Sequence, residues 1–273
     1  MHTYSELYKK IEPACCFITV FVDGEKVSEG SGFSYTPQGE VLTAAHVVTG
    51  RWPIRHDDYK NPSQKIYCKF PGLPVIEYFV FFCSIDLEVS AFSSRVQIDL
   101  AVLSPKEQAT ATQSYPYIPA SIQPPQLGKE VFMAGYSEEV ELPFKIDTLL
   151  QRDAPEAQEF HEAMSKGYMA DMMGPLIKRG VVGNVRRIVA ENTGAGVRVD
   201  CDVLYIDNAM HPGASGGPLF NVNGKAIGVV SQRAVTSVDA GKEGMVPVPS
   251  GCTVAISLAP LAYITSRNHA SGG

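Results

Sequence analysis

Short apolar stretches bounded by turn residues run along most of the chain. Each is rich in Val, Ile, Phe and Tyr and stops at Gly, Pro, Asn, Asp or Ser, a pattern typical of β-strands. We expect strands at 14–22, 30–36, 40–48, 78–84, 97–104, 130–136, 181–190, 197–206, 224–232 and 251–258. Many short strands with turn signals between them predict an all-β barrel or sandwich.

A proline-rich segment, residues 104–128, separates the two groups of strands. Its composition predicts an extended connection between two domains. Residues 4–11 predict a short helix ahead of the first strand. Residues 153–173 predict a longer helix, because Asp153 can cap it and Pro155 suits its first turn.

The composition narrows the class of protein. With 45% hydrophobic and 19% charged residues, the 273-residue chain has enough apolar material for a core. Its net charge of −6 and its lack of a basic stripe argue against nucleic-acid binding. No apolar run reaches the roughly 18 residues of a membrane span, and the first residues lack the pattern of a secretory signal. We therefore expect a soluble, cytoplasmic protein.

The cysteines and histidines are scattered along the chain, six of each. The cysteines form no CxxC pair, and in a cytoplasmic setting buried free thiols are expected in preference to disulfides. The histidines have no paired ligand spacing. We therefore expect no bound metal and no cofactor.

Three stretches, taken together, indicate a chemical function. EVLTAAHVV places His46 at the end of an apolar strand, VQIDLAVLS places Asp99 in another, and GASGG places Ser215 in a glycine-rich turn. Singly, such residues are more often a core histidine, a structural carboxylate and an ordinary turn serine. Together they match nucleophilic catalysis, because imidazole can take the proton of a serine hydroxyl while a buried carboxylate holds the imidazole in the useful tautomer.

Five motifs carry a resemblance to a known family: GSGF (30–33), VLTAAHVV (41–48), DLAVL (99–103), PGASGGPLF (212–220) and GKAIGVVS (224–231). With them the chain resembles the trypsin/chymotrypsin-like serine peptidase superfamily, and most of all its HtrA-type (Deg-type) peptidase domain, without a PDZ domain. The resemblance implies two antiparallel β-barrels of the chymotrypsin type, with the active site in the cleft between them.

The same resemblance implies a role for each residue of the site. His46 would be the general base, Asp99 the carboxylate that orients it, and Ser215 the nucleophile. The backbone amides of Gly213 and Ser215 would form the oxyanion hole. Ser231 occupies the place where this superfamily has a serine near the buried aspartate.

The sequence offers the tripeptide IDL twice, once at Asp86 and once at Asp99. A carboxylate that orients a catalytic histidine must be shielded from water. Apolar and polar residues alternate after Asp86, as in a strand with one face in solvent, whereas an unbroken apolar run follows Asp99. We therefore assign the role to Asp99.

Each barrel would form one domain of the chain. The expected boundaries are 1–118 for the N-terminal barrel with its leading helix, 119–265 for the C-terminal barrel, and 266–273 for a flexible tail. A stretch at about 137–173 has no counterpart in the family and reads as a helical insertion in the second barrel. Two roles stay open for it: regulation or binding of a protein partner, and permanent structural support.

Substrate choice is inferred by position from the resemblance. Residues on the floor and wall of the specificity pocket would be Ala209, Met210, Ser231, Gln232 and Arg233. The stretch 251–253 would form its back. The floor carries no acidic residue, so cleavage after Lys or Arg is disfavoured and small or medium apolar side chains fit better.

The expected function is that of a serine endopeptidase that cleaves protein or peptide substrates through an acyl-enzyme. Ala214 stands where zymogen-type trypsins have an aspartate, so control by loop order or a partner is expected instead of activation by N-terminal cleavage. One alternative is a catalytically silent binding module on the same fold. Another, an ester hydrolase, is disfavoured because the chain has no GxSxG elbow.

Overall fold

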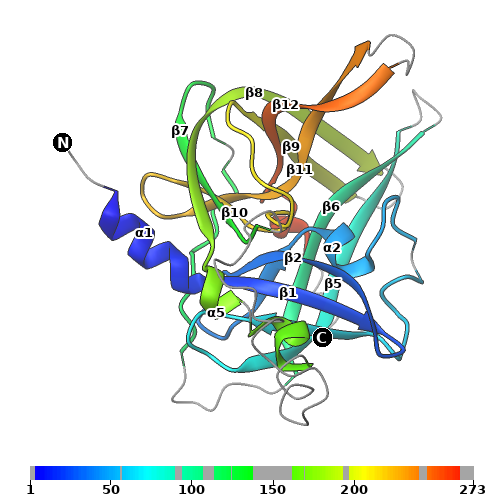
Figure 1. The fold of residues 1–273 in the computed structure, drawn as a ribbon. Coiled ribbons are helices and arrows are strands. Elements are labelled where there is room, and N and C mark those ends of the chain that lie inside the picture. Colours follow the sequence, from blue (N-terminus) through cyan, green and yellow to red (C-terminus); the bar gives the residue numbers. More distant parts are fainter. Residues whose placement is uncertain are drawn as a thin grey trace.

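Two closed β-barrels, each of six antiparallel strands, make up most of the molecule (Figure 1). The computed structural model describes residues 4–55, 57–89, 94–106, 114–123, 125–137, 162–168, 170–192, 197–239 and 245–264. The expected all-β double-barrel architecture is confirmed.

The first barrel closes in the order β1-β2-β3-β6-β5-β4. Its strands are β1 (Cys15–Val22), β2 (Glu25–Ser34), β3 (Val41–Thr43), β4 (Lys65–Lys69), β5 (Val75–Val89) and β6 (Ser94–Pro105). The short strand β3 pairs with both β2 and β6, with Thr43 opposite Ala101. This pairing brings the chain that follows β3 close to the middle of β6.

The second barrel closes in the order β10-β11-β12-β9-β8-β7. Its strands are β7 (Glu130–Gly135), β8 (Leu176–Asn192), β9 (Val197–Ile206), β10 (Pro218–Asn221), β11 (Ala226–Asp239) and β12 (Met245–Ser257). The strands of the first barrel end at Pro105 and those of the second begin at Glu130. The boundary at 118/119 within that interval stays a prediction.

The described helices are short: α1 (Ser5–Ile11), η1 (Glu12–Ala14), α2 (Ala45–Thr49), η2 (Met164–Tyr168), α5 (Ala170–Met173) and a last turn at 261–264. The expected leading helix is α1. It lies against the second barrel, because the rings of Tyr4 and Tyr8 pack edge-on against Phe132 of β7, and the Tyr4 hydroxyl donates to Glu130 across 2.5 Å. None of the helices in the described part is long and apolar enough to cross a membrane.

The expected strand at 40–48 is wrong in its second half. Only Val41–Thr43 are extended, and the chain then forms the helix α2, which contains His46. Gly50 ends this helix with φ +70° and donates its N–H to the His46 carbonyl across 2.8 Å. The stretch is buried on nearly all sides, and a short apolar run of that kind does not distinguish a strand from a buried helix.

The helix expected at 153–173 can be assessed only in part, because residues 153–161 and Met169 lie outside the described residues. Over the described part, one continuous helix is wrong. The backbone leaves helical geometry at Gly167, where φ is +114°. A β-carbon at this glycine would lie 3.2 Å from the Cβ of Lys69, so the turn allows close packing against the first barrel.

The six cysteines are all free, as expected. Cys252 is partly exposed and the others are buried. Within the described residues, no group of three or more His, Cys, Asp or Glu side chains is placed to hold a metal ion.

Candidate active site

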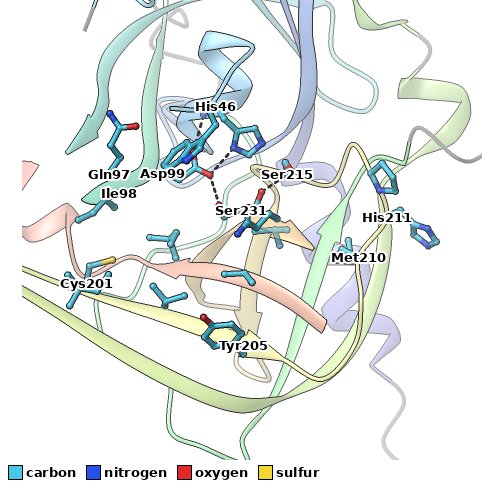
Figure 2. A pocket seen from close by; sticks show the side chains of 18 residues that line it. His46, Gln97, Ile98, Asp99, Cys201, Tyr205, Met210, His211, Ser215 and Ser231 are labelled. Atoms are coloured by element: carbon cyan, nitrogen blue, oxygen red, sulfur yellow. Dashed lines mark hydrogen bonds and ion pairs between the residues drawn. The ribbon is translucent and has the colours of Figure 1, made fainter. Parts of the chain in front are cut away.

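His46 and Asp99 lie side by side at the edge of the first barrel (Figure 2). His46 Nδ1 is 2.8 Å from Asp99 Oδ2, and the backbone N–H of His46 donates to Asp99 Oδ1 across 3.0 Å. The carboxylate therefore fixes both the ring and the start of helix α2. This arrangement follows from the β3–β6 pairing, which places helix α2 beside the centre of β6.

Asp99 also reaches the second barrel. The hydroxyl of Ser231, on β11, donates to Asp99 Oδ2 across 2.5 Å. Asp99 is only 4% exposed, so these hydrogen bonds replace the water that its charge would otherwise require.

The other candidate carboxylate, Asp86, lies elsewhere. It is exposed on β5, and its Oδ1 accepts a hydrogen bond of 2.8 Å from Gln97 Nε2. Asp86 and Gln97 are directly opposite in the β5–β6 pairing. The structure thus brings Asp99, and not Asp86, next to His46.

Glycines shape the turn that carries Ser215. Gly213 and Gly216 have φ values of +85° and +89°, in the left-handed region that favours glycine. A β-carbon on Gly216 would lie 2.0 Å from the Ser31 carbonyl oxygen, and one on Gly217 would lie 1.9 Å from the Ala134 carbonyl oxygen. The repeated glycines therefore let the turn pack against the backbones of both barrels.

Ser31, on β2, connects this turn to the first barrel. Its backbone N–H donates to the Ser215 carbonyl, and its hydroxyl donates to the Gly213 carbonyl, both across 2.8 Å. The same hydroxyl accepts from the Tyr136 N–H across 2.8 Å, and the Ser31 carbonyl accepts from Thr43 Oγ1 across 2.7 Å. A buried serine of the first barrel thus holds the backbone on both sides of Ala214.

The Ser215 hydroxyl is oriented toward a backbone acceptor. It donates to the carbonyl of Ser231 across 3.0 Å. Ser231 therefore contacts two members of the site, binding Asp99 with its side chain and Ser215 with its backbone (Figure 2).

These residues line one cavity of about 630 Å³ between the barrels. The first barrel contributes His46, Trp52, Gln97, Ile98 and Asp99. The second contributes Ile188, Cys201, Val203, Tyr205, Met210, His211, Pro212, Ser215, Val230, Ser231, Gln232, Val254 and Ile256. The wall formed by the second barrel is largely apolar, and Figure 2 shows Cys201, Tyr205 and Met210 on it.

Three of the expected substrate-binding residues, Met210, Ser231 and Gln232, line the cavity. Ala209 is not among its described lining residues, and its carbonyl accepts a hydrogen bond from Lys178 Nζ. The side chain of Arg233 lies outside the described residues.

None of residues 251–253, the expected back of the pocket, is among the described residues that line the cavity, but Thr253 lies next to Val254, which does. Thr253 is buried, accepts from the Met210 N–H across 2.8 Å and donates to the Asn208 carbonyl across 2.7 Å. It therefore supports the segment that includes Met210.

Cys201 is a cavity residue with a second potential nucleophile, its thiol. Burial, and to a smaller extent the charge of Asp202, raise the pKa of the Cys201 thiol to about 12. The thiol is therefore protonated at neutral pH, and the thiolate is the nucleophilic form of cysteine.

The residues that sequence reasoning missed at the site include Ser31, Trp52 and Gln97. Ser31 lies in the GSGF motif, whose individual residues were given no role. Trp52 could have been noticed as the single tryptophan of the chain, a few residues after His46. The role of Gln97 depends on a loop contact for which the sequence contains no signal.

Comparisons with known proteins agree with the fold and with the order of the motifs. A family model described as a trypsin-like peptidase domain matches residues 30–229. Among curated proteins, the chain is 40% identical over 57 residues to the serine protease Do-like HtrA of Bacillus subtilis, and 36% identical over 61 residues to HtrB of the same organism. These matches cover 21% and 22% of the chain but only 12% and 13% of the relatives.

Among solved structures, the chain is similar to the active form of the Rv3671c protease from M. tuberculosis. That likeness has a TM-score of 0.55 and 19% identity, and it covers 94% of this chain and 81% of the other. The serine endoprotease from Yersinia pestis also gives a TM-score of 0.55, with 17% identity and 98% and 66% coverage. These likenesses bear on the fold alone.

The family expected from the sequence is therefore confirmed. Two barrels of the expected type and a family match over most of the chain show that this protein belongs to the trypsin-like peptidase domain family, with HtrA-type proteases among its relatives.

Proposed function

We propose that the chain is a serine endopeptidase that cleaves protein or peptide substrates through a Ser-His-Asp triad. The observation that supports this most strongly is the buried contact between Asp99 and His46 Nδ1, in the same cavity as Ser215. A histidine held in this way by a carboxylate keeps its other ring nitrogen, Nε2, available as a base.

In this mechanism Ser215 Oγ attacks the carbonyl carbon of the scissile peptide bond while His46 Nε2 takes the hydroxyl proton. Asp99 stabilises the resulting imidazolium through Nδ1–H. His46 then gives the proton to the leaving amine, the C–N bond breaks, and an acyl-enzyme remains. A water molecule, activated by the same imidazole, hydrolyses the ester and restores Ser215.

The backbone N–H groups of Gly213 and Ser215 would stabilise the oxyanion that forms on the carbonyl oxygen. Two features support this role. Gly213 has the left-handed φ of +85°, and its own carbonyl is bound by the Ser31 hydroxyl. The attack also requires Ser215 Oγ to leave the Ser231 carbonyl and turn toward His46, which is a rotation about one side-chain bond.

For specificity, we propose small or medium apolar side chains at the cleaved position. Met210 and Val254 line the cavity, and both are buried. Neither provides a carboxylate that would pair with a substrate Lys or Arg. A peptide-library profile dominated by Lys, Arg, Asp or Glu at the cleaved position would contradict this proposal.

For regulation, we propose control by loop order or by a partner at the 137–173 insertion. Ala214 is buried and has no carboxylate to pair with a new N-terminus, so N-terminal cleavage has no evident target here. We also propose a cytoplasmic location, which the six free thiols support because reducing compartments preserve thiols.

A fluorophosphonate probe tests the catalytic proposal, because it labels only an activated serine. The wild-type protein should be labelled, and Ser215→Ala should not. Absence of labelling in the folded wild type would favour the catalytically silent binding module. If the protein is labelled by the probe and hydrolyses p-nitrophenyl acetate but cleaves no peptide, the result would favour the ester hydrolase.

A further inference from the structure

The indole of Trp52 is a large apolar group at the edge of the candidate active site. Trp52 is the single tryptophan of the chain, it is 53% exposed, and it lines the same cavity as His46 and Ser215. Tryptophan usually buries most of its surface in a folded protein, and it is enriched where partners bind. An exposed indole in a catalytic cavity therefore points to contact with a ligand.

The loop that carries Trp52 is held in place on both sides of the indole. On one side, Arg51 Nε binds Asp58 Oδ2 across 2.8 Å, and the same oxygen accepts from the Arg55 N–H across 2.7 Å. On the other, the side-chain amide of Gln97 binds the backbone of Ile54 twice. The Ile54 N–H donates to Gln97 Oε1 across 2.8 Å, and Gln97 Nε2 donates to the Ile54 carbonyl across 2.6 Å.

Because these contacts already order the loop, the loop loses less conformational entropy when a ligand binds. Gln97 lies on β6 two residues before Asp99, so the loop is fixed to the strand that positions His46. A side chain presented from a pre-ordered loop contributes more of its contact energy to affinity than one that must be ordered on binding.

The surroundings of Trp52 identify the chemistry of its ligand. Ile98, from the same barrel, lines the cavity with it, and the facing wall includes Val203 and Ile256. We propose that Trp52 is a specificity-determining residue that packs against an apolar or aromatic side chain of the peptide substrate, on the first-barrel side of the scissile bond. This inference rests on the proposed peptidase function.

Kinetics on peptide and small-ester substrates test the proposal. Trp52→Ala should lower kcat/KM roughly 10- to 100-fold on a Trp-free peptide that spans a cleavage site mapped in β-casein, with the loss mostly in KM. Hydrolysis of p-nitrophenyl acetate and fluorophosphonate labelling should stay within a fewfold of wild type, because these small reagents use the proposed catalytic groups but have no peptide side chain to pack against Trp52. Trp52→Phe should recover most of the peptide activity.

Phe79→Ala is the matched control. Phe79 is 44% exposed on β5, and it is not among the described residues that line the cavity. Its truncation removes a similar exposed aromatic ring from the same barrel. Peptide kinetics of this variant should match those of the wild type.

The single tryptophan provides a readout that does not depend on turnover. In Ser215→Ala, titration with the same Trp-free peptide should shift the emission of Trp52 to shorter wavelength as the indole loses water. Binding is measured in parallel by the anisotropy of a labelled copy of the peptide. Emission that stays unchanged while the peptide binds would overturn the proposal, as would unchanged peptide kinetics in Trp52→Ala.

Failure of the proposed peptidase function gives a different result from failure of the Trp52 proposal. In that case the folded wild type neither reacts with the fluorophosphonate nor cleaves β-casein. A peptide from a Trp-free library then replaces the casein peptide in the fluorescence titration. If no library peptide binds, the Trp52 proposal fails together with the peptidase proposal.

Discussion

The hydroxyl of Ser31 donates a 2.8 Å hydrogen bond to the carbonyl of Gly213, two residues before the candidate nucleophile. The same hydroxyl accepts from the Tyr136 N–H. A side chain of the first barrel thus fixes the turn whose amides would bind the oxyanion, and it ties that turn to the end of β7.

Ser31→Ala should therefore lower kcat roughly 10- to 100-fold with little change in KM, because an oxyanion donor that is displaced loses transition-state stabilisation. It should also cost about 1–3 kcal/mol of unfolding free energy, since a buried carbonyl and a buried N–H lose their partner. Steady-state kinetics and urea denaturation measure the two effects.

Ser34→Ala is the control for this prediction. Ser34 is buried on the same strand, but its hydroxyl donates to the nearby Thr36 carbonyl. This variant should lose stability and keep kcat. Equal kcat losses in the two variants would show that Ser31 acts only through stability.

Asp99→Asn should reduce peptide turnover by roughly 10⁴-fold, because the amide holds the imidazole in the wrong tautomer. Asp86→Asn should stay within a fewfold of wild type, since the new amide keeps an oxygen that can accept from Gln97 Nε2. The two variants are compared on one peptide substrate. The opposite ranking would show that the wrong carboxylate was assigned.

The ion pair between the buried ammonium of Lys69 and Asp171 leads to a prediction about the stability of the insertion. Lys69 is fully buried, and its Nζ contacts Asp171 Oδ1 across 2.5 Å and the Phe70 carbonyl across 2.8 Å. Asp171→Ala should cost about 2 kcal/mol of unfolding free energy, because it leaves a buried charge without its counter-ion. The cost is no larger because Asp171 itself is 40% exposed, so water weakens the ion pair. Adding Lys69→Met should restore most of that loss.

Two measurements complete this experiment. Glu162→Gln, which removes the exposed pair with Lys166 in the same insertion, should leave the unfolding free energy close to that of the wild type, because water and salt screen an exposed ion pair. Peptide kinetics of Asp171→Ala then separate the two roles left open for 137–173. A changed kcat at a temperature where the variant is folded indicates regulation, and an unchanged kcat indicates support.

The Cys201 thiol predicts a loss of stability in alkali. Its pKa is about 12 in the folded protein against 9.0 for an ordinary thiol, because of burial. Below about pH 9 the thiol is protonated in both the folded and the unfolded chain, and its contribution to stability is complete. Above about pH 9 the unfolded chain loses the proton first. The unfolding free energy then falls by up to about 1.4 kcal/mol per pH unit until the folded pKa is reached.

Cys201→Val, which has no proton to lose, should show a shallower decline. Denaturation in reducing buffer at about pH 8 and about pH 10 measures the difference. Identical slopes for the two proteins would contradict the prediction. Peptide turnover of Cys201→Val at neutral pH should stay within a fewfold of wild type, because the protonated thiol has no part in the chemistry.

The sequence was most informative where pattern and packing agree. The double barrel followed from strand periodicity together with the family motifs, and the choice of Asp99 over Asp86 followed from the unbroken apolar run that buries it. Helix α2 was mistaken for a strand because it is apolar on nearly every side and too short for a helical period to appear.

Contacts between residues far apart in the sequence could not be anticipated. The bond from Gln97 to the Ile54 backbone depends on where a loop packs, and the Ser31–Gly213 bond depends on how the two barrels dock. The break at Gly167 has the same origin, because it is the proximity of Lys69 that favours a residue without a side chain there. Local propensity contains no information about these partners.

Ser31 and Gly213 are 182 residues apart in the chain, and Asp99 and Ser231 are 132 apart. Closing such long loops is slow, and neither bond can form before both barrels have folded and docked. During refolding, the emission of Trp52, which reports on the first barrel, should therefore reach its native value before fluorophosphonate reactivity returns. On the proposed function, the folding chain would then be protected from its own activity, because Ser215 would become reactive only when little unfolded polypeptide remains to be cleaved.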